Sequence, residues 1–384
     1  MSPEPHKRIA ATLEERRAFG LLRRLSVFDT GNNVLNLAGN DYLDLARDPA
    51  VIDAACAATR RYGASSSASP LITGYTPVHR ELEDLLCFWH HCPAGLIWNS
   101  GFTANQAVLS RLPQKGDLVL ADRLVHHSMI SGILQSRARL QRYRHLDLDH
   151  LESLLQKAAR SGRTVFVVTE SVFSMDGDFP DLRAMAGLKA TYGFFWIVDE
   201  AHATGWYGPA GAGLLTESGG AEAADVIVGT LGKALGSQGA YTLFCDANLR
   251  EFLINTAGEF IYSTYLAPAC AAAASAAIER CRDLAAEQPR RRAASSAFRK
   301  ALTTDGWRVP PGDSPIVPVR IGDAEQTMAL GNRLAAQGLR VGTVRPPTVP
   351  EGSSRLRLSL KRTLRDEDYR RIRDVLTRAS QGES

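Results

Sequence analysis

The chain has 384 residues, of which 45% are hydrophobic and 22% are charged, and its formal net charge is +4. This length and hydrophobic content predict an ordinary folded protein with room for two or three domains, and they exclude disorder as the default. The positive charge comes without a long Lys/Arg block, so a nucleic-acid partner is poorly supported and an acidic small molecule is favoured.

Six cysteines are scattered without Cys-x-x-Cys spacing or partnered histidines, so we expect neither a metal site nor a disulfide framework. The first ten residues lack the apolar core of a secretory signal, and no apolar run approaches the roughly 18 residues of a membrane span. We therefore expect a cytoplasmic protein that does not bind membranes. The densest basic run, Pro289 to Arg292, is expected to be a solvated helix start rather than a binding patch.

The N-terminal part of the chain predicts one helix and one short strand. Thr12 to Glu15 (TLEE) has the pattern of a capping box, which predicts a helix that begins there and runs to about Leu25. A short strand is expected at Val34 to Ala38. We assign residues 1–48 to a separate N-terminal segment, and we expect the next helix from Pro49 to about Tyr62.

From residue 63 to residue 284, short apolar strands alternate with helices. Gly63 to Pro70 is almost entirely Gly, Ala and Ser, which suggests a loop that approaches another group closely. Strands are expected at 95–98, 118–121, 140–143, 164–169, 194–198, 226–229 and 240–244. Helices are expected near 78–90, from 103, from 128, and at 150–159, 181–192 and 268–284. The alternation predicts an α/β fold, in which a mostly parallel sheet carries helices on both faces, in a large domain at 49–284.

The pattern changes beyond residue 284, where longer helices surround three strands. Helices are expected at 291–303, 324–337 and 366–377, and strands at 316–319, 339–344 and 355–359. This arrangement predicts a small α+β C-terminal domain at 285–384.

Two motifs carry the chemistry. Lys233 lies in the run GTLGKALG (229–236), and Asp199 opens the run DEAHATG (199–205), 34 residues upstream. A lysine amine among small residues can form a Schiff base with the aldehyde of pyridoxal phosphate (PLP), and a carboxylate at a strand end can keep the pyridine nitrogen protonated. Alone, Lys233 would be read as a surface lysine beside a glycine-rich turn. The Asp199 run, in this order and at this distance, favours a PLP site.

Five groups of polar or glycine residues directly follow predicted strands, at 100–102, 122–126, 170–174, 199–202 and 230–233. Ligands gather beyond the carboxyl ends of the strands in sheets of this kind, so we expect all five groups to meet at one edge. A lone His126 would be read as structural, and Ser174 could be only the N-cap of a turn. The position of His126 after a strand favours a functional reading.

The motifs together resemble those of the α-oxoamine synthase family of fold-type I PLP-dependent transferases. The resemblance covers most of the chain, and its further runs are NDYL (40–43), SGFTAN (100–105), DRLVHHS (122–128) and TESVFSMDG (169–177). It implies that Lys233 bonds covalently to PLP, that Asp199 pairs with the pyridine nitrogen and that His126 stacks over the ring.

Further roles are also implied by the resemblance alone. His202 and Ser174 would bond the phenolic oxygen of the cofactor, and the phosphate would be bound by Gly101, Phe102 and Thr230. Thr264 would reach the phosphate of a neighbouring subunit, which implies a homodimer with shared active sites.

The substrate side is read from RPPTVP (345–350) and the strand that follows it. Arg357 is our choice for the clamp on the amino-acid carboxylate, because a guanidinium binds carboxylate bidentately; a solvent-facing role in the strand is the alternative. Arg23 and Thr348 match positions that contact the acyl thioester. The family's glycine-rich run ending in Ser-Arg is replaced here by GASSSASP (63–70), which leaves the acyl preference open.

The resemblance is closest to members that condense L-alanine with a pimeloyl thioester to 8-amino-7-oxononanoate, CO2 and free thiol, in biotin biosynthesis. The acyl carrier, coenzyme A or acyl-carrier protein, stays open. The alternatives are a family member that uses glycine, serine or another acyl group, a transaminase, and a catalytically silent partner subunit. Retention of Lys233, Asp199 and His126 argues against the silent subunit.

Overall fold

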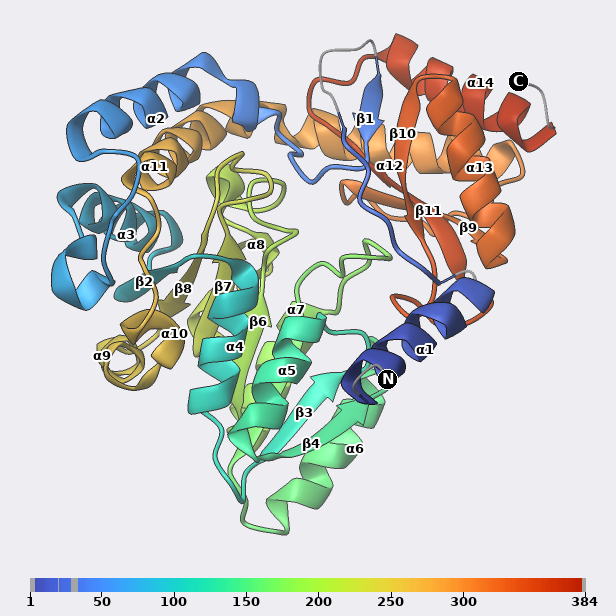
Figure 1. Cartoon of the computed structure of the whole chain (residues 1–384). Coiled ribbons are helices and arrows are strands. Elements are labelled where there is room, and N and C mark those ends of the chain that lie inside the picture. Colours follow the sequence, from blue (N-terminus) through green and yellow to red (C-terminus); the bar gives the residue numbers. More distant parts are fainter. Residues whose placement is uncertain (1–3, 20, 29–33, 382–384) are drawn as a thin grey trace.

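The computed structural model describes residues 4–19, 21–28 and 34–381, which form two lobes, each built on its own sheet (Figure 1). The seven-stranded sheet has the order β2-β8-β7-β6-β5-β3-β4. Its strands are β2 (Ala94–Trp98), β3 (Leu118–Asp122), β4 (Arg139–Tyr143), β5 (Val165–Glu170), β6 (Phe195–Asp199), β7 (Val226–Thr230) and β8 (Ala240–Phe244). Only β8 runs antiparallel to its neighbours. The prediction of a mostly parallel sheet is therefore confirmed.

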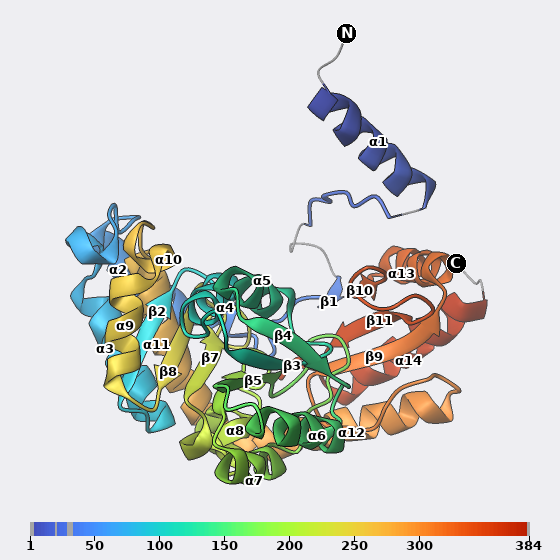
Figure 2. The same ribbon diagram turned by 90° about the horizontal axis from the view of Figure 1, so that it is seen from below.

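Helices cover both faces of this sheet, as predicted for buried parallel strands. Figure 2 shows α4 and α5 on one side of the strands and α6, α7 and α8 on the other. The helices of this lobe are α2 (Pro49–Tyr62), α3 (Pro77–His90), α4 (Gly101–Arg111), α5 (His127–Ser136), α6 (Leu148–Ala159), α7 (Leu182–Tyr192), α8 (Leu214–Glu217), α9 (Ala247–Thr256), α10 (Gly258–Ile261) and α11 (Pro268–Asp283). Every helix that we expected between residues 49 and 284 is present, and α8, α9 and α10 are additional.

The smaller lobe contains a four-stranded sheet of order β1-β10-β11-β9. Its strands are β1 (Leu35–Leu37), β9 (Ile316–Gly322), β10 (Leu339–Val344) and β11 (Ser354–Ser359), and its helices are α12 (Gln288–Thr304), α13 (Ala324–Ala336) and α14 (Asp366–Gln381). β1 pairs in parallel with β10, with Leu35 opposite Leu339. The strand that we assigned to a separate N-terminal segment thus forms the edge of this sheet. The boundary near residue 284 stays a prediction.

The N-terminal helix differs from its prediction. α1 (Glu4–Ala18) begins before Thr12 and ends well before Leu25; residues 1–3, 20 and 29–33 of the predicted segment lie outside the described part of the chain. Thr12 is no cap, because its hydroxyl donates to the carbonyl of Arg8 within the helix. None of the described residues of α1 is buried, and Figure 2 shows the helix standing clear of both lobes.

The basic run at the start of α12 is only partly solvated, so that prediction was wrong in detail. Arg291 is 6% exposed and donates to the carbonyl of Gly205 at 2.8 Å. Arg292 pairs with Glu217 and Asp313. The run therefore attaches α12 to the large lobe. Among the described residues, no helix is both long and apolar enough to cross a bilayer.

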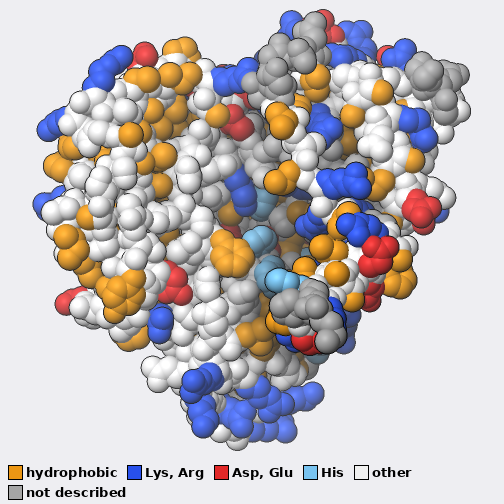
Figure 3. Space-filling view, viewed as in Figure 1, with side chains coloured by type: hydrophobic (Ala, Val, Ile, Leu, Met, Phe, Trp, Pro, Cys, Tyr) orange, Lys and Arg blue, Asp and Glu red, His pale blue; other side chains and the backbone are white. Residues whose placement is uncertain are grey.

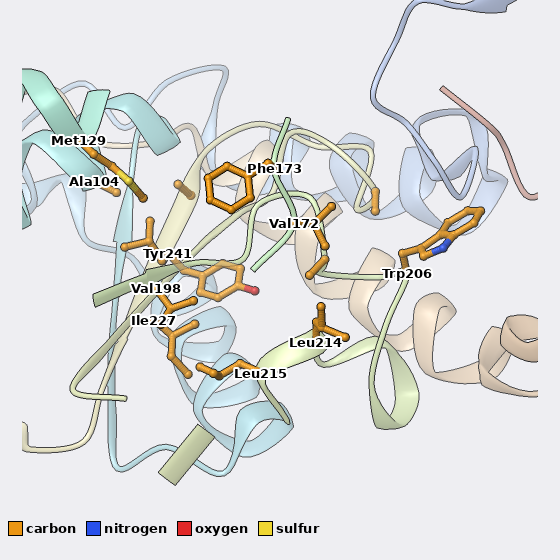
Figure 4. Packing of buried hydrophobic residues seen from close by; sticks show 14 of the residues in the cluster. Ala104, Met129, Val172, Phe173, Val198, Trp206, Leu214, Leu215, Ile227 and Tyr241 are labelled. Carbon is orange, nitrogen blue, oxygen red and sulfur yellow. The ribbon is translucent and has the colours of Figure 1, made fainter. Parts of the chain in front are cut away.

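Close packing between β7 and β8 explains why one position of the lysine motif is glycine. Figure 4 shows Val198, Ile227 and Tyr241, from three adjacent strands, within one buried cluster. A Cβ atom on Gly229 would lie 2.1 Å from the Tyr241 ring, far inside van der Waals contact. Only glycine fits there, and β7 can therefore lie close to β8 directly before the loop that carries Lys233.

Candidate active site

The carboxyl ends of β2, β3, β5, β6 and β7 all point to the same edge of the large sheet, because β2 and β7 are both antiparallel to β8. The five residue groups that we expected to converge follow these strands. In the space-filling view, histidine side chains lie in the hollow between the two lobes (Figure 3). The structure therefore brings the predicted groups together at one edge.

Lys233 takes part in a chain of hydrogen bonds. Its Nζ lies 2.8 Å from His202 Nε2, and His202 Nδ1 lies 2.7 Å from the hydroxyl of Tyr42. Tyr42 donates to Asn40 at 3.2 Å, so the consistent assignment puts the ring proton on Nδ1 of His202 and leaves Nε2 to accept from Lys233. Burial and the positive charges of Lys233 and Arg357 lower the pKa of His202 well below its usual value.

The environment of Lys233 favours a reactive amine. Burial is the largest influence and lowers the pKa of Lys233 to about 8, while the carboxylates of Asp199 and Glu170 act in the opposite direction. A lysine with this pKa is partly neutral near physiological pH. Nucleophilic lysines need this property.

Asp199 is 7% exposed and is held on both carboxylate oxygens. The amide of Asn105 donates to Oδ2 at 2.7 Å, and the backbone N–H of Ala201 donates to Oδ1 at 2.8 Å. Asn105 also donates to Ser128, whose hydroxyl lies 2.7 Å from His126 Nδ1. Asp199 and the exposed His126 are thus connected through two buried polar side chains.

The predicted phosphate contacts lie at two adjacent places. Gly101 and Phe102 form the first turn of α4, where backbone N–H groups have no partner within the helix, and α4 contacts β7. Thr230 ends β7, and its hydroxyl donates to the carbonyl of Gly239 at 3.1 Å and accepts from the N–H of Gly232 at 3.2 Å. The Thr230 hydroxyl thus shapes the turn that leads to Lys233.

Arg357 reaches the site from β11 of the small lobe and is 6% exposed, so it is no solvent-facing strand residue. Its Nε donates to the backbone carbonyl of Ser174 at 2.6 Å, and its Nη2 donates to Asn40 at 3.1 Å and to Tyr42 at 3.2 Å. Nη1 donates to Ser359 at 2.8 Å. The guanidinium is therefore fixed beside the hydrogen-bond chain that contains His202. Ser174 contacts the guanidinium through its backbone carbonyl.

The remaining predicted residues are exposed. Arg23 and Thr348 are exposed, and Arg23 Nη2 donates to Thr348 Oγ1 at 3.0 Å. Thr264 is also exposed, and its carbonyl accepts from the Asn99 side chain at 2.8 Å. The loop at 63–70 does approach another segment closely: Ser66 donates to the carbonyl of Leu266, and the N–H of Tyr265 donates to the carbonyl of Ala68.

Sequence reasoning missed several residues of this network. Tyr42 and Asn105 lie inside runs that matched the family, but their partners lie 160 and 94 positions away. Glu170, which is 2% exposed, has its pKa raised to about 8 by burial and by the charge of Asp199. Glu170 lies in the group at 170–174 that we expected at this edge, because it ends a strand, but no role was predicted for it.

Known proteins resemble this chain over almost its whole length. A family model for aminotransferase class I and II matches residues 32–376. An 8-amino-7-oxononanoate synthase of Chlorobaculum parvum is 43% identical over 340 residues, 87% of this chain and 86% of the relative, and one of Geobacter sulfurreducens is 41% identical over 381 residues, 96% and 97%. The chain belongs to the α-oxoamine synthase family.

Solved structures of this family share the fold. Serine palmitoyltransferase of Sphingomonas wittichii superposes with a TM-score of 0.91 at 27% identity, over 99% of this chain and 98% of the neighbour. The 8-amino-7-oxononanoate synthase of Francisella tularensis gives a TM-score of 0.77 at 26% identity, over 91% and 98%. Membership in the family makes the chain a PLP-dependent enzyme.

The residues at the sheet edge fit PLP. The cofactor carries an aldehyde, a basic ring nitrogen and a phosphate, and the site offers a partly neutral lysine, a buried carboxylate and the start of α4. Asp199 would pair with the ring nitrogen and Lys233 would hold the aldehyde carbon. The backbone of Gly101 and Phe102 would hold the phosphate.

Proposed function

We propose that this protein condenses L-alanine with a pimeloyl thioester and releases 8-amino-7-oxononanoate, CO2 and the free thiol, in biotin biosynthesis. A bond forms between the alanine Cα and the thioester carbonyl carbon. The bonds from Cα to its hydrogen and to the carboxylate break, the thiol leaves, and a proton returns to Cα after CO2 is lost. The observation that carries the proposal is about 40% identity, over nearly full length, to relatives named 8-amino-7-oxononanoate synthase.

When bound, PLP supplies an electron sink that stabilises negative charge at the amino-acid Cα. In this chain, Lys233 is the base that takes the Cα proton, since its lowered pKa matches a group that must accept a proton near neutrality. The neutral His202 ring, fixed by Tyr42, orients the lysine amine. Asp199 stabilises the positive charge on the ring nitrogen, and Asn105 keeps the carboxylate in place.

The remaining site residues bind and orient the two substrates. Arg357 binds the alanine carboxylate, supported by its fixed position beside Tyr42 and Ser174. Correct orientation of the Cα bonds is worth several orders of magnitude in rate. His126 and Ser174 form part of the wall of the cofactor pocket. Arg23 and Thr348 contact the acyl thioester, delivered by coenzyme A or by acyl-carrier protein.

We further propose a cytoplasmic homodimer in which Thr264 completes the partner's phosphate site. Three apolar side chains near Thr264 support this part of the proposal: Leu71, Ile72 and Tyr262 are 51%, 77% and 85% exposed. They lie on neighbouring segments, because α10 contacts the π-helical turn Pro70–Gly74. Apolar side chains gathered in this way favour a protein interface.

The deciding experiment measures thiol release by PLP-loaded protein given pimeloyl-coenzyme A or pimeloyl-acyl-carrier protein, with L-alanine, glycine or L-serine supplied separately. Release that depends on L-alanine supports the proposal. The L-serine arm tests whether this chain accepts the amino acid for which the serine palmitoyltransferase neighbours are named. Lys233→Ala is the control, and a variant that keeps even a tenth of the activity would overturn the role of Lys233. Transfer of the amino group to a 2-oxo acid, without thiol release, would indicate a transaminase.

A further inference from the structure

His145 lies outside all the motifs, yet it bridges two acidic side chains that frame the site. It follows β4, and its Nδ1 lies 2.8 Å from Asp122 Oδ1 while its Nε2 lies 3.2 Å from Asp178 Oδ2. Asp122 ends β3 with a side chain that is only 1% exposed, and Asp178 belongs to the loop after β5. The ring therefore connects the segments that follow three neighbouring strands.

The two segments joined by His145 carry predicted site residues. The loop after β3 leads from Asp122 to His126, and Asp122 shapes its start by accepting from the N–H of Leu124 at 2.8 Å. The loop after β5, residues 171–178, contains Ser174, whose carbonyl accepts from Arg357. Both segments also act on Glu170 at the end of β5, since the backbone N–H groups of His126 and Ser174 oppose the rise of its pKa caused by burial.

The bridge requires a charged ring. Only a protonated imidazole donates from both nitrogens, and both nitrogens of His145 face carboxylates. Burial alone would lower the pKa of His145, but the hydrogen bonds and charges of Asp122 and Asp178 raise this pKa to about 9. The Phe173 ring packs edge-on at a centroid distance of 4.5 Å, which fixes the plane of the imidazole.

Several other charged groups lie around His145. A cavity of about 630 Å³ lies beside the ring, and its charged lining consists of His145, Asp176, Asp178, Arg308, Arg320 and Arg355. Asp176 pairs with Arg320 and Arg355 of the small lobe. Asp122 and Asp178 thus remain as the two carboxylates that bind His145.

We propose that His145 is a positioning residue: its charged ring locks the loop that carries His126 to the loop that carries Ser174 and so fixes both relative to Lys233. The effect on turnover rests on the proposed function, whereas the effect on the loops does not. Positioning residues of this kind lie behind the catalytic groups and hold them within fractions of an ångström of their working geometry.

The test compares His145→Asn with the parent protein and with the matched control His91→Asn. His91 occupies the left-handed position at the end of α3, where asparagine is tolerated, and it lies outside the site. Asp178→Asn is the second variant, since it keeps the shape of the side chain and removes its charge. Amide hydrogen exchange is measured on PLP-free protein, and visible circular dichroism of bound PLP, kcat and KM are measured on loaded protein.

For His145→Asn we expect exchange at 123–127 and 171–178 to accelerate about tenfold, while exchange elsewhere stays close to that of the parent protein. The visible circular dichroism should weaken at equal PLP content, and kcat should fall about tenfold or more while KM for L-alanine changes little. Asp178→Asn should shift the same readouts in the same direction, and His91→Asn should shift none.

Two outcomes would overturn the proposal. One is parent-like exchange and dichroism in His145→Asn, and the other is faster exchange throughout the molecule with a lower thermal midpoint, which would make His145 only a stabilising residue. If the parent protein releases no thiol with any amino acid, the proposed function fails, but the exchange and dichroism comparisons still decide the role of His145.

Discussion

Arg23 and Thr348 lie 325 positions apart in the chain, and a 3.0 Å hydrogen bond joins the guanidinium of one to the hydroxyl of the other. Both were assigned to the acyl thioester on the strength of a resemblance. Two further bonds hold the same N-terminal segment against the small lobe: Arg345 donates to the carbonyl of Leu22 at 3.2 Å, and Arg340 donates to Ser26 at 3.3 Å. The segment and the small lobe therefore present Arg23 and Thr348 as one surface.

Arg23→Ala should raise KM for the pimeloyl thioester about tenfold, because a hydrogen bond to a charged group contributes roughly 1.5–3 kcal/mol. The value of kcat at saturating thioester should change little. The matched control is Arg24→Ala, which removes the neighbouring exposed arginine. Equal effects of the two substitutions in steady-state kinetics would show that only general positive charge matters.

The lowered pKa of Lys233 predicts how PLP capture depends on pH. With a pKa of about 8, the neutral fraction of the amine rises about tenfold per pH unit below pH 8 and levels off above it. The rate at which PLP-free protein captures added PLP, followed by absorbance, should rise in the same way. A simple alkyl amine with a pKa near 10.4 is the control, and a rate that keeps rising beyond pH 9, as with that amine, would contradict the assignment.

The same shift affects stability. The pKa of Lys233 is lower in the folded chain than in the unfolded chain, so the unfolded chain binds more protons between about pH 8 and pH 10.5. The lysine's contribution to the stability of the PLP-free protein therefore rises with pH across this window and is lost below about pH 8.

Asn105→Ala should weaken PLP binding about tenfold, because it removes a 2.7 Å bond to the buried Asp199 and leaves that oxygen without its donor. Equilibrium dialysis of PLP measures the change. Asn255→Ala serves as the control, since the Asn255 side chain is exposed on α9 and donates to the backbone carbonyl of Glu251. Unchanged PLP affinity in Asn105→Ala would mean that the N–H of Ala201 alone suffices to hold Asp199.

Gly229→Ala should destabilise the protein by roughly 1–3 kcal/mol, because its Cβ would overlap the Tyr241 ring in a closely packed core. Gly187→Ala is the matched control: it lies within α7, where a Cβ would meet open space, so it should stabilise by about 0.5–1 kcal/mol. Urea unfolding measures both, and equal midpoints would refute the packing argument.

Much of the large lobe was predictable because its signals are local. α2 was expected at Pro49–Tyr62 and has those bounds, since a proline start and helical apolar spacing lie within the segment itself. α9 was missed because it buries only Leu253, which gives no apolar stripe. α10 has four residues, too few for any periodicity. The bounds of α1 were predicted wrongly for a related reason. The helix has no buried face, so the prediction relied on a capping-box pattern that occurs there by chance.

In the active site, too, some features could be predicted from the sequence and others could not. Lys233 and Asp199 could be paired because order and spacing along the chain are visible in the sequence. The bonds from Tyr42 to His202 and from Asn105 to Asp199 could not, because they depend on how distant elements pack. Arg291 shows the same limit: its burial follows from the approach of Gly205, 86 positions away, and no composition rule contains that information.

The pairing of β1 with β10 constrains the order of events during synthesis. Leu35 leaves the ribosome long before Leu339, its partner in the parallel ladder. The large lobe, whose strands all lie between residues 94 and 244, can be complete by then. The N-terminal strand therefore stays unpaired until β10 emerges near the end of synthesis. We expect closure of the small sheet to be a late, slow step, because it joins segments about 300 residues apart.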